Sequence, residues 1–186
     1  PTEIYTLSLH GALPISAKFD YHRAKSIEEA ESLCKGNTDA SFLAGGHSLI
    51  PAMKLRLSDP GALIDISGID DLKGISRDGD AIRIGALTTH AEVETSDVVK
   101  DGCAALSEAA GMIGDPQVRN RGTIGGNVAH ADPASDYPGI LMALGATIVT
   151  SSRSIAVDNF FTGLFETALN DGEIITEIQV PAIGAG

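Results

Sequence analysis

The stretch FLAGGHSLIP at residues 42–51 and the related stretch TIGGNVAH at residues 123–130 are the most informative parts of this chain. Each places a Gly-Gly pair beside an apolar, strand-like run, with hydroxyl or amide side chains close by. Glycine pairs free the backbone to adopt positive φ angles and to approach a ligand closely. Consecutive exposed N–H groups then form an anion-binding nest, so two nests predict one bridging ligand such as a dinucleotide pyrophosphate. The alternative is that both stretches are ordinary tight turns, because glycine is the usual turn residue.

Composition limits the kinds of ligand that this chain can hold. It has 186 residues, 43% of them hydrophobic, and a formal net charge of −12. The length allows one domain or two small lobes, and the acidic balance argues against a nucleic-acid surface, which needs clustered Lys and Arg. A bound phosphate is therefore expected to rest mainly on backbone N–H groups. Arg119 and Arg121 are the cations beside the second stretch; they either offset phosphate charge, meet a partner subunit or lie on an ordinary surface.

The cysteines and histidines predict no metal site. Cys34 and Cys103 are too far apart in sequence for a short metal or redox motif and are interpreted as core thiols of a cytoplasmic protein. Two cysteines cannot ligate a [2Fe–2S] cluster, so any such cluster is expected on another chain. His130 and Asp132 lack a third ligand at suitable spacing. No apolar run reaches the ~18 residues that a membrane span needs.

Local patterns predict a mixture of helices and strands. Ser26 and Glu29, like Thr89 and Glu92, have the spacing of a capping box, and Asp78-Gly79 between alternating runs predicts a hairpin. Residues 115–136 show little periodicity and are predicted to be a long irregular segment of functional importance. Strands are expected at 19–22, 41–44, 62–66, 74–77, 81–85, 146–151, 154–157 and 173–180, and helices at 27–35, 49–57, from 89 onward, at 101–112 and at 138–144.

This order of elements predicts an α+β fold with two lobes. The first lobe is expected over residues 17–72, where a compact β-α-β unit lies, and the second over residues 73–181. A doubly wound nucleotide fold is not favoured, since no G-x-G-x-x-G opens a helix after the first strand. Residues 1–16 are interpreted as a non-native leader and residues 182–186 as the start of a linker that is cut short.

The two motifs and their spacing resemble the flavoprotein, or medium, subunit of the molybdenum hydroxylases, a group that includes carbon monoxide dehydrogenase and the xanthine dehydrogenases. The likeness covers residues 19–181. The matching segments are residues 42–54, 115–127, 132–136 and 172–178. The resemblance implies the two-lobed FAD-binding domain of the vanillyl-alcohol-oxidase-like (PCMH-type) class, with FAD between the lobes and a further C-terminal domain that this chain lacks.

The resemblance also implies which residues contact the cofactor. The first motif would form one pyrophosphate cradle and the second motif another, with two residues reaching the ribityl and phosphate region and three near the flavin ring. In that order these residues are Leu43, Ala44, Gly45, Gly46, His47, Ser48 and Leu49; Thr123, Gly126 and Asn127; Ser135 and Asp136; Ile113, Gly114 and Ile175. Asp136 alternatively caps the helix that follows it.

The function implied by the resemblance is that of an FAD-carrying subunit in a three-component oxidoreductase. A large subunit would hold molybdopterin, and a small subunit would pass electrons from [2Fe–2S] clusters to this flavin. The flavin would reduce quinone, NAD or oxygen, in the cytoplasm or at the inner face of the membrane through partners. No catalytic side chain is predicted, because the chemistry belongs to the flavin. The alternatives are a non-catalytic flavin- or nucleotide-binding module and a stand-alone flavin reductase of the same fold.

Overall fold

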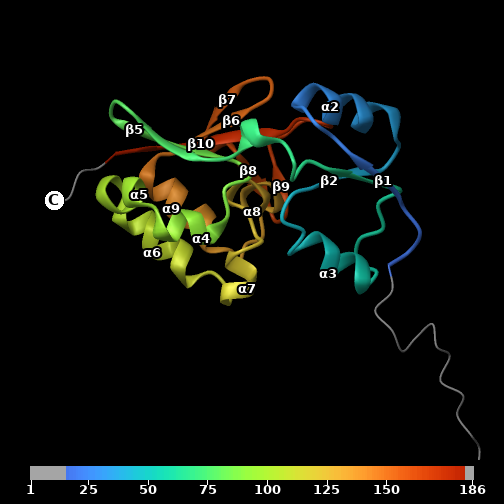
Figure 1. Cartoon of the computed structure of the whole chain (residues 1–186), viewed down its shortest axis with the longest axis horizontal. Helices are drawn as coiled ribbons and strands as arrows, with labels where there is room; N and C mark the ends of the chain where they lie inside the picture. Colours follow the sequence, from blue (N-terminus) through green and yellow to red (C-terminus); the bar gives the residue numbers. More distant parts are fainter. Residues whose placement is uncertain (1–15, 183–186) are drawn as a thin grey trace, which may run out of the picture.

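A computed structural model describes residues 16–182 of the chain. Apart from Ser16 and Ala182, the predicted leader and the predicted linker lie outside the described residues. The described part contains a three-stranded sheet, a five-stranded sheet and a short two-stranded hairpin. Figure 1 shows the three-stranded sheet and the five-stranded sheet side by side, with helix α8 (Ile124–His130) between them.

The three-stranded sheet is parallel and has the order β1-β3-β2. Every residue of the central strand is buried. Ser26 caps the following helix by accepting a 3.2 Å hydrogen bond from the Glu29 N–H, as the capping-box spacing predicts. The predicted β-α-β unit is confirmed, although its second helix is shorter than expected. The elements are β1 (Asp20–Arg23), α2 (Ile27–Gly36), β2 (Ala40–Leu43), α3 (Leu49–Lys54) and β3 (Ala62–Asp65), followed by the 3-10 turn η1 (Asp70–Leu72).

The five-stranded sheet is antiparallel and has the order β4-β5-β10-β6-β7. Its central strand β10 comes last in the chain and pairs with β5 on one side and β6 on the other. The predicted hairpin is confirmed: Gly79 takes a φ of +59° between β4 and β5. The strands are β4 (Ile75–Asp78), β5 (Ala81–Gly85), β6 (Thr147–Thr150), β7 (Ser154–Ala156) and β10 (Ile175–Pro181).

Helices α4, α5, α6 and α9 lie together on one side of this sheet (Figure 1). Thr89 and Glu92 form the predicted capping box at the start of α4. The helix expected at residues 101–112 is two helices, because Cys103 leaves the helical conformation with φ −157° and ψ 69°. The helices are α4 (His90–Thr95), α5 (Asp97–Gly102), α6 (Ala104–Met112) and α9 (Asp136–Leu144).

The prediction that residues 115–136 are irregular is wrong. This segment contains α7 (Pro116–Arg119) and α8 (Ile124–His130). Two glycines near the start of α8 weaken the local helix signal, since glycine has a low helix propensity. The sequence reading also missed a small hairpin after the 3-10 turn η2 (Val157–Asn159), formed by β8 (Phe161–Gly163) and β9 (Glu166–Thr167).

The hydrophobic cores of the two sheets meet at residues 86–87, which follow β5, and at residues 174–175, where β10 begins. Ala86 and Ile175 belong to the core under the five-stranded sheet, whereas their neighbours Leu87 and Ile174 belong to the core of the three-stranded sheet. The Ala86 N–H donates to the Thr176 carbonyl at 3.0 Å and ties the two segments together. The predicted α+β class is confirmed. The division into lobes at residues 72 and 73 stays a prediction.

Candidate functional site

The first glycine motif, residues 42–51, leads from the end of β2 through a loop into α3. Gly46 has a φ of +74°, so the predicted positive φ angle is confirmed at this position. In the part of the chain that the structure describes, the backbone N–H groups of residues 45–49 donate to no protein acceptor. These five consecutive donors are available to an anion, as expected of a nest.

The second glycine motif has a different architecture. Its residues form the first turns of α8, and Thr123 caps that helix by accepting a 3.1 Å hydrogen bond from the Gly126 N–H. The Ile124 and Gly125 N–H groups donate to the carbonyls of Thr88 and Ala86 at 3.0 and 2.9 Å. The prediction of a second nest with exposed N–H groups is therefore wrong, because these donors already have partners.

Glycine in the second motif serves close packing instead. A Cβ added at Gly125 would lie 2.5 Å from the Ala86 Cβ, so only glycine lets α8 approach the segment after β5. Gly126 would place a Cβ 2.8 Å from the Thr123 hydroxyl that caps the helix. Neither glycine has a positive φ angle. The second motif is therefore the closely packed start of a helix and not a turn.

The two motifs are in direct contact. A Cβ at Gly45 would overlap the Arg121 carbonyl oxygen and would lie 3.0 Å from the Gly122 Cα. Gly122 in turn packs against His90, whose Nε2 would lie 2.6 Å from an added Cβ. Three glycine contacts thus bring the loop after β2, the start of α8 and the start of α4 to one place.

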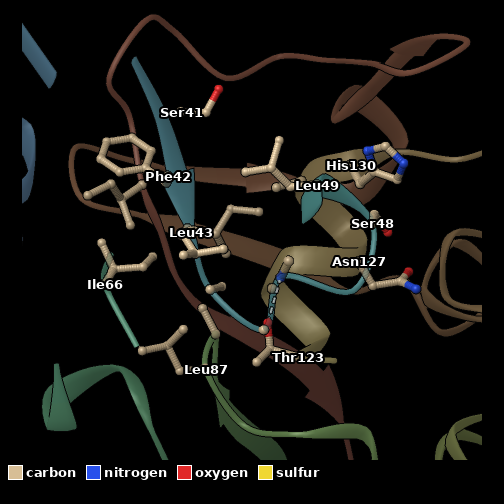
Figure 2. Close-up of a pocket in the computed structure, with 18 of the residues that line it drawn as sticks. Ser41, Phe42, Leu43, Ser48, Leu49, Ile66, Leu87, Thr123, Asn127 and His130 are labelled. Atoms are coloured by element: carbon tan, nitrogen blue, oxygen red, sulfur yellow. Dashed lines mark hydrogen bonds between the residues drawn. The ribbon is translucent and has the colours of Figure 1, made fainter. Parts of the chain in front are cut away.

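A cavity of about 550 Å³ lies at this junction. Figure 2 shows Ile66 and Leu87 at one end of it and Ser48, Asn127 and His130 at the other, so one end is apolar and the other polar. Twelve of the fifteen predicted cofactor residues line the cavity. They are Leu43, Ala44, Gly45, Gly46, His47, Ser48, Leu49, Ile113, Thr123, Gly126, Asn127 and Ile175.

The other three predicted residues, Gly114, Ser135 and Asp136, are not part of the cavity lining. Gly114 has a φ of +46° and packs on Val118. The Ser135 hydroxyl donates a short hydrogen bond to the Asn127 side-chain carbonyl and so supports a lining residue from behind. Ser135, not Asp136, occupies the N-cap position of α9, and Asp136 is the first residue of that helix.

Sequence reasoning missed several lining residues because distant segments supply them. Ile66 follows β3, Ala86 and Leu87 follow β5, and residues 169–174 form the loop before β10. Cys34 also lines the cavity and is half-buried, whereas Cys103 is buried as predicted. Strand pairing and helix packing bring these segments together, so no local motif marks them as parts of one cavity.

His90 is a buried histidine in the cavity wall that the sequence did not single out. It is 3% exposed, and burial lowers its pKa from 6.5 to about 4, with a smaller contribution from His47. Its ring lies 5.3 Å from that of Tyr137, centroid to centroid. Among the described residues, the His90 Nδ1 and the Tyr137 hydroxyl are the buried side-chain atoms without a hydrogen-bond partner. His90 is therefore neutral near pH 7.

The cations beside the second motif are not directed into the cavity. Arg119 forms a 2.9 Å ion pair with Glu94 and donates to the Ile113 and Gly114 carbonyls. Neither Arg119 nor Arg121 lines the cavity. Within residues 16–182, no group of three or more His, Cys, Asp or Glu side chains is arranged to hold a metal ion. The same residues include no helix with the length and apolar character needed to cross a membrane.

These residues fit FAD. The cavity volume lies in the range of about 300–1,000 Å³ that is usual for small-molecule sites. Its apolar end suits an aromatic ring system, its free N–H groups suit a pyrophosphate, and its polar end suits sugar hydroxyls. The cradle at Gly45 and Gly46 has no side chains that would block the approach of a phosphate.

Comparisons with known proteins agree with this chemistry. The profile of a family described as "FAD binding domain in molybdopterin dehydrogenase" matches residues 17–183. The chain is 44% identical over 177 residues to the carbon monoxide dehydrogenase medium chain of Hydrogenophaga pseudoflava, covering 92% of this chain and 62% of that protein. It is also 44% identical over 170 residues to the glyceraldehyde dehydrogenase medium chain of Sulfolobus acidocaldarius, covering 89% of this chain and 60% of that one.

A solved structure has the same fold. A chain of the carbon monoxide dehydrogenase from Hydrogenophaga pseudoflava that lacks the Mo-pyranopterin moiety of its cofactor matches with a TM-score of 0.90 at 45% identity, covering 92% of this chain and 62% of that one. The chain spans about three fifths of the length of the curated relatives it matches. The matched residues include both glycine motifs and the cavity. This chain therefore belongs to the family of FAD-binding domains of the molybdopterin dehydrogenases, which are components of FAD-dependent oxidoreductases.

Proposed function

We propose that this chain carries FAD as the electron-transfer subunit of a molybdenum-containing hydroxylase or dehydrogenase. The observation that carries the proposal is the row of five free N–H groups at residues 45–49 beside a cavity with one apolar end. Backbone donors hold a pyrophosphate at contact distance and need no clustered Lys or Arg, which suits a chain of net charge −12.

The lining residues have distinct roles in this proposal. Residues 43–49 hold the pyrophosphate, while Thr123, Gly126 and Asn127 form the opposite wall. Ile113 and Ile175 are apolar contacts for a ring of the cofactor. Gly114, Ser135 and Asp136 act from outside the wall; Ser135 does so by orienting the Asn127 side chain. Bound FAD supplies the one- and two-electron chemistry, and the chain binds, orients and shields it.

The relatives' names as medium chains support partner subunits for this chain as well. We assign to it an iron–sulfur small subunit, which delivers electrons from [2Fe–2S] clusters, and a molybdopterin large subunit, which oxidises the substrate. An external acceptor, which is quinone, NAD or oxygen, would then take the electrons that bound FAD holds. The proposed location is the cytoplasm, with contact to the inner face of the membrane through partners.

Ligand discrimination tests the binding half of the proposal. The chain is titrated with FAD, FMN, riboflavin and ADP, following flavin fluorescence and competition. We expect FAD to bind much more tightly than FMN or riboflavin, and ADP to compete, because only FAD and ADP carry the pyrophosphate. Equal affinity for FAD and riboflavin would contradict the role of residues 45–49.

Reoxidation tests the electron-transfer half. The FAD-loaded chain is reduced with dithionite in the absence of oxygen and then mixed with a quinone, NAD or oxygen. Return of the oxidised flavin spectrum faster than in a parallel reaction of free reduced FAD identifies the acceptor, because reduced flavins react with oxygen and quinones without a protein. A rate no faster than that of free FAD with all three acceptors would favour the alternative of a non-catalytic flavin-binding module.

A further inference from the structure

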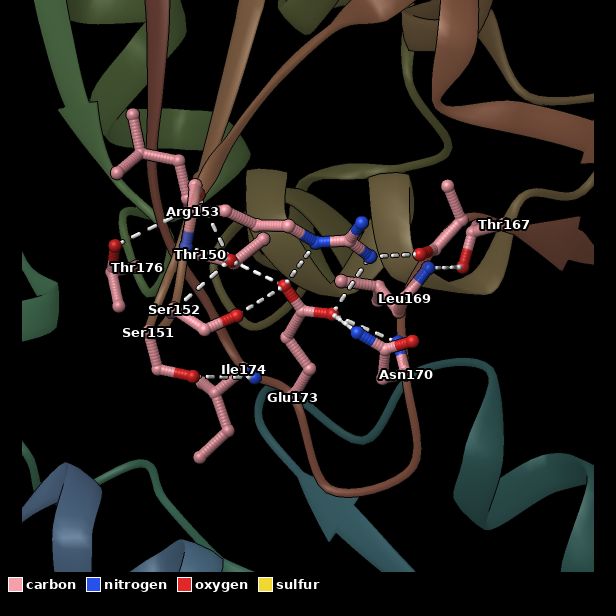
Figure 3. Close-up of polar contacts among 12 residues, drawn as sticks. Thr150, Ser151, Ser152, Arg153, Thr167, Leu169, Asn170, Glu173, Ile174 and Thr176 are labelled. Atoms are coloured by element: carbon pink, nitrogen blue, oxygen red, sulfur yellow. Dashed lines mark hydrogen bonds and ion pairs between the residues drawn. The ribbon is translucent and has the colours of Figure 1, made fainter.

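Glu173 is a buried carboxylate that the function described so far does not use. Its side chain is only 3% exposed, and it lies just before β10. Figure 3 shows donors converging on it from two directions. It accepts six hydrogen bonds: from the Thr150 and Ser152 hydroxyls at 2.6 and 2.8 Å, from Arg153 Nε and Nη2 at 3.0 Å each, and from the Asn170 N–H and side-chain amide at 2.8 and 2.9 Å.

These donors belong to two separate segments. Residues 150–153 end β6 and form the turn before β7, whereas Asn170 lies in the loop before β10. Arg153 joins both segments, because it donates to Glu173 and also to the Ala168 carbonyl. Glu173 and Arg153 together therefore fix the two ends of the loop at residues 168–173 to the turn between β6 and β7.

This loop forms one wall of the FAD cavity. Residues 169–175 all line it. At the tip of the loop, Gly172 has a φ of +76°, and an added Cβ would lie 3.6 Å from the Cys34 Sγ of α2. The loop thus crosses from the five-stranded sheet to the helix that covers the three-stranded sheet, and it closes this side of the cavity.

The two residues after Glu173 pack into different cores. Ile174 belongs to the core of the three-stranded sheet and Ile175 to that of the five-stranded sheet. Ile174 is held in register by Ser151, whose N–H donates to the Ile174 carbonyl at 2.8 Å and whose hydroxyl accepts from the Ile174 N–H at 3.3 Å. A shift of Glu173 would therefore move both isoleucines relative to the cavity.

We propose that Glu173 is a positioning residue that holds the 169–175 wall of the cavity in the geometry that binds FAD. This inference rests on the proposed FAD-binding function and assigns to Glu173, itself part of the wall, the role of fixing the position of the wall. Its physical basis is that a fully satisfied buried network rigidifies its surroundings, whereas a half-satisfied one is costly. Glu173 is the acceptor that joins residues 150–153 to Asn170, so removing it loosens the attachment of the loop to the turn before β7.

Glu173→Gln tests the proposal, because the amide keeps the size of the carboxylate but turns an NH₂ group toward donors. Glu177→Gln is the matched control. Glu177 lies on β10, four residues after Glu173, pairs with Arg83 at 2.9 Å and does not line the cavity. Three quantities are measured for both variants and the wild-type chain: amide hydrogen exchange of residues 168–175 without FAD, FAD affinity, and the absorption spectrum of the bound flavin.

In Glu173→Gln we expect faster amide hydrogen exchange at residues 168–175 and a shift of the flavin absorption bands. We also expect FAD to bind at least about tenfold more weakly. This is the size of effect seen when residues that support the ligands of a bound metal are removed. Glu177→Gln should match the wild-type chain in all three. Wild-type exchange and affinity in Glu173→Gln would overturn the proposal, and so would equal losses in both variants.

Two further outcomes are informative. If Glu173→Gln does not fold, Ser152→Ala removes a single donor and should give a smaller change in the same direction; wild-type exchange and affinity in that variant would overturn the proposal. If the wild-type chain binds no FAD, the proposed function fails. The exchange comparison then still decides whether Glu173 orders this wall.

Discussion

Gly45 and Arg121 lie so close together that any side chain at Gly45 would overlap the Arg121 carbonyl oxygen. One residue comes from the loop after β2 and the other from the turn before α8. The contact is between backbones, which makes it insensitive to most side-chain changes but intolerant of a Cβ. It sets the distance between the two glycine motifs, and this distance sets the shape of the cavity.

Gly45→Ala should therefore be strongly destabilising. We expect a loss of about 3 kcal/mol in the free energy of unfolding, at the upper end of the usual range for overpacking, because backbone cannot move aside as a side chain does. Gly36→Ala is the control, since an added Cβ there meets nothing within 4 Å. Urea denaturation of both variants gives the comparison. A Gly45→Ala chain with the stability of Gly36→Ala would contradict the close contact.

Gly46→Ala separates backbone strain from ligand binding. Both Gly46 (φ +74°) and Gly145 (φ +63°) are left-handed, so alanine at either position should cost roughly 1–2 kcal/mol of stability. Only Gly46 lines the cavity. FAD titration should show weaker binding in Gly46→Ala and wild-type binding in Gly145→Ala. Equal affinities would show that the conformation of Gly46 is not needed for the cofactor.

Salt should have little effect on FAD affinity. Arg119 is committed to Glu94 and neither nearby arginine lines the cavity, so the donors available to a pyrophosphate are N–H groups at contact distance. Sites built from cations lose affinity steeply between roughly 50 and 200 mM salt. Here we expect a change of less than about threefold, because short-range contacts are weakly screened. A fall of tenfold or more in the titrations would reveal a cationic site.

His90 predicts a pH dependence of stability. Its pKa falls from 6.5 to about 4 on folding, so the unfolded chain binds more protons between these values and stability should rise with pH across that window. His90→Phe removes this contribution. Its stability deficit relative to wild type should therefore shrink as the pH drops from 7 to 4.5. Denaturation curves at several pH values measure the deficit, and a constant one would contradict the burial of a neutral histidine.

Glu173 should give a separate, more acidic transition. Its hydrogen bonds with Arg153, followed by those with Asn170, Thr150 and Ser152, lower its pKa well below the ordinary value of 4.5. The folded chain therefore holds fewer protons at this site, and the stabilisation present above pH 4.5 is lost as the pH falls further. Glu173→Gln should be less stable at neutral pH but lose less on acidification. Acid titrations of the wild-type chain and of Glu173→Gln, followed by circular dichroism, measure this difference. Parallel unfolding curves for the two chains would contradict the lowered pKa of Glu173.

Signals that act within a few residues allowed much of the fold to be predicted. The caps at Ser26 and Thr89 and the Asp78-Gly79 turn are local, and the elements that they mark are present. Helix α8 could not be predicted in this way, because its glycines disfavour an isolated helix and its first N–H groups depend on Ala86 and Thr88. Tertiary contacts, not propensity, hold it in place.

The residues of the candidate site likewise fall into two groups: those that a local sequence pattern marks and those that only tertiary contacts bring to the cavity. Residues 43–49 are contiguous and carry their own signature, and all of them line the cavity. Sheet pairing and helix packing bring Ile66, Leu87, His90 and the loop before β10 to the cavity. Among them, only the end of this loop falls in a segment that carries the family resemblance, residues 172–178. Glu173 belongs to that loop, and the hydrogen-bond network through which it acts is spread over residues 150–173.

The crossing of the two cores at residues 86–87 and 174–175 has a thermodynamic consequence. Because neighbouring side chains are shared between the cores beside the cavity, a ligand there contacts both halves of the chain at once. A ligand that binds only the folded chain stabilises it. At a concentration of 100 times its Kd, it adds about 2.7 kcal/mol to the free energy of unfolding. The flavin would then stabilise both sheets together against unfolding.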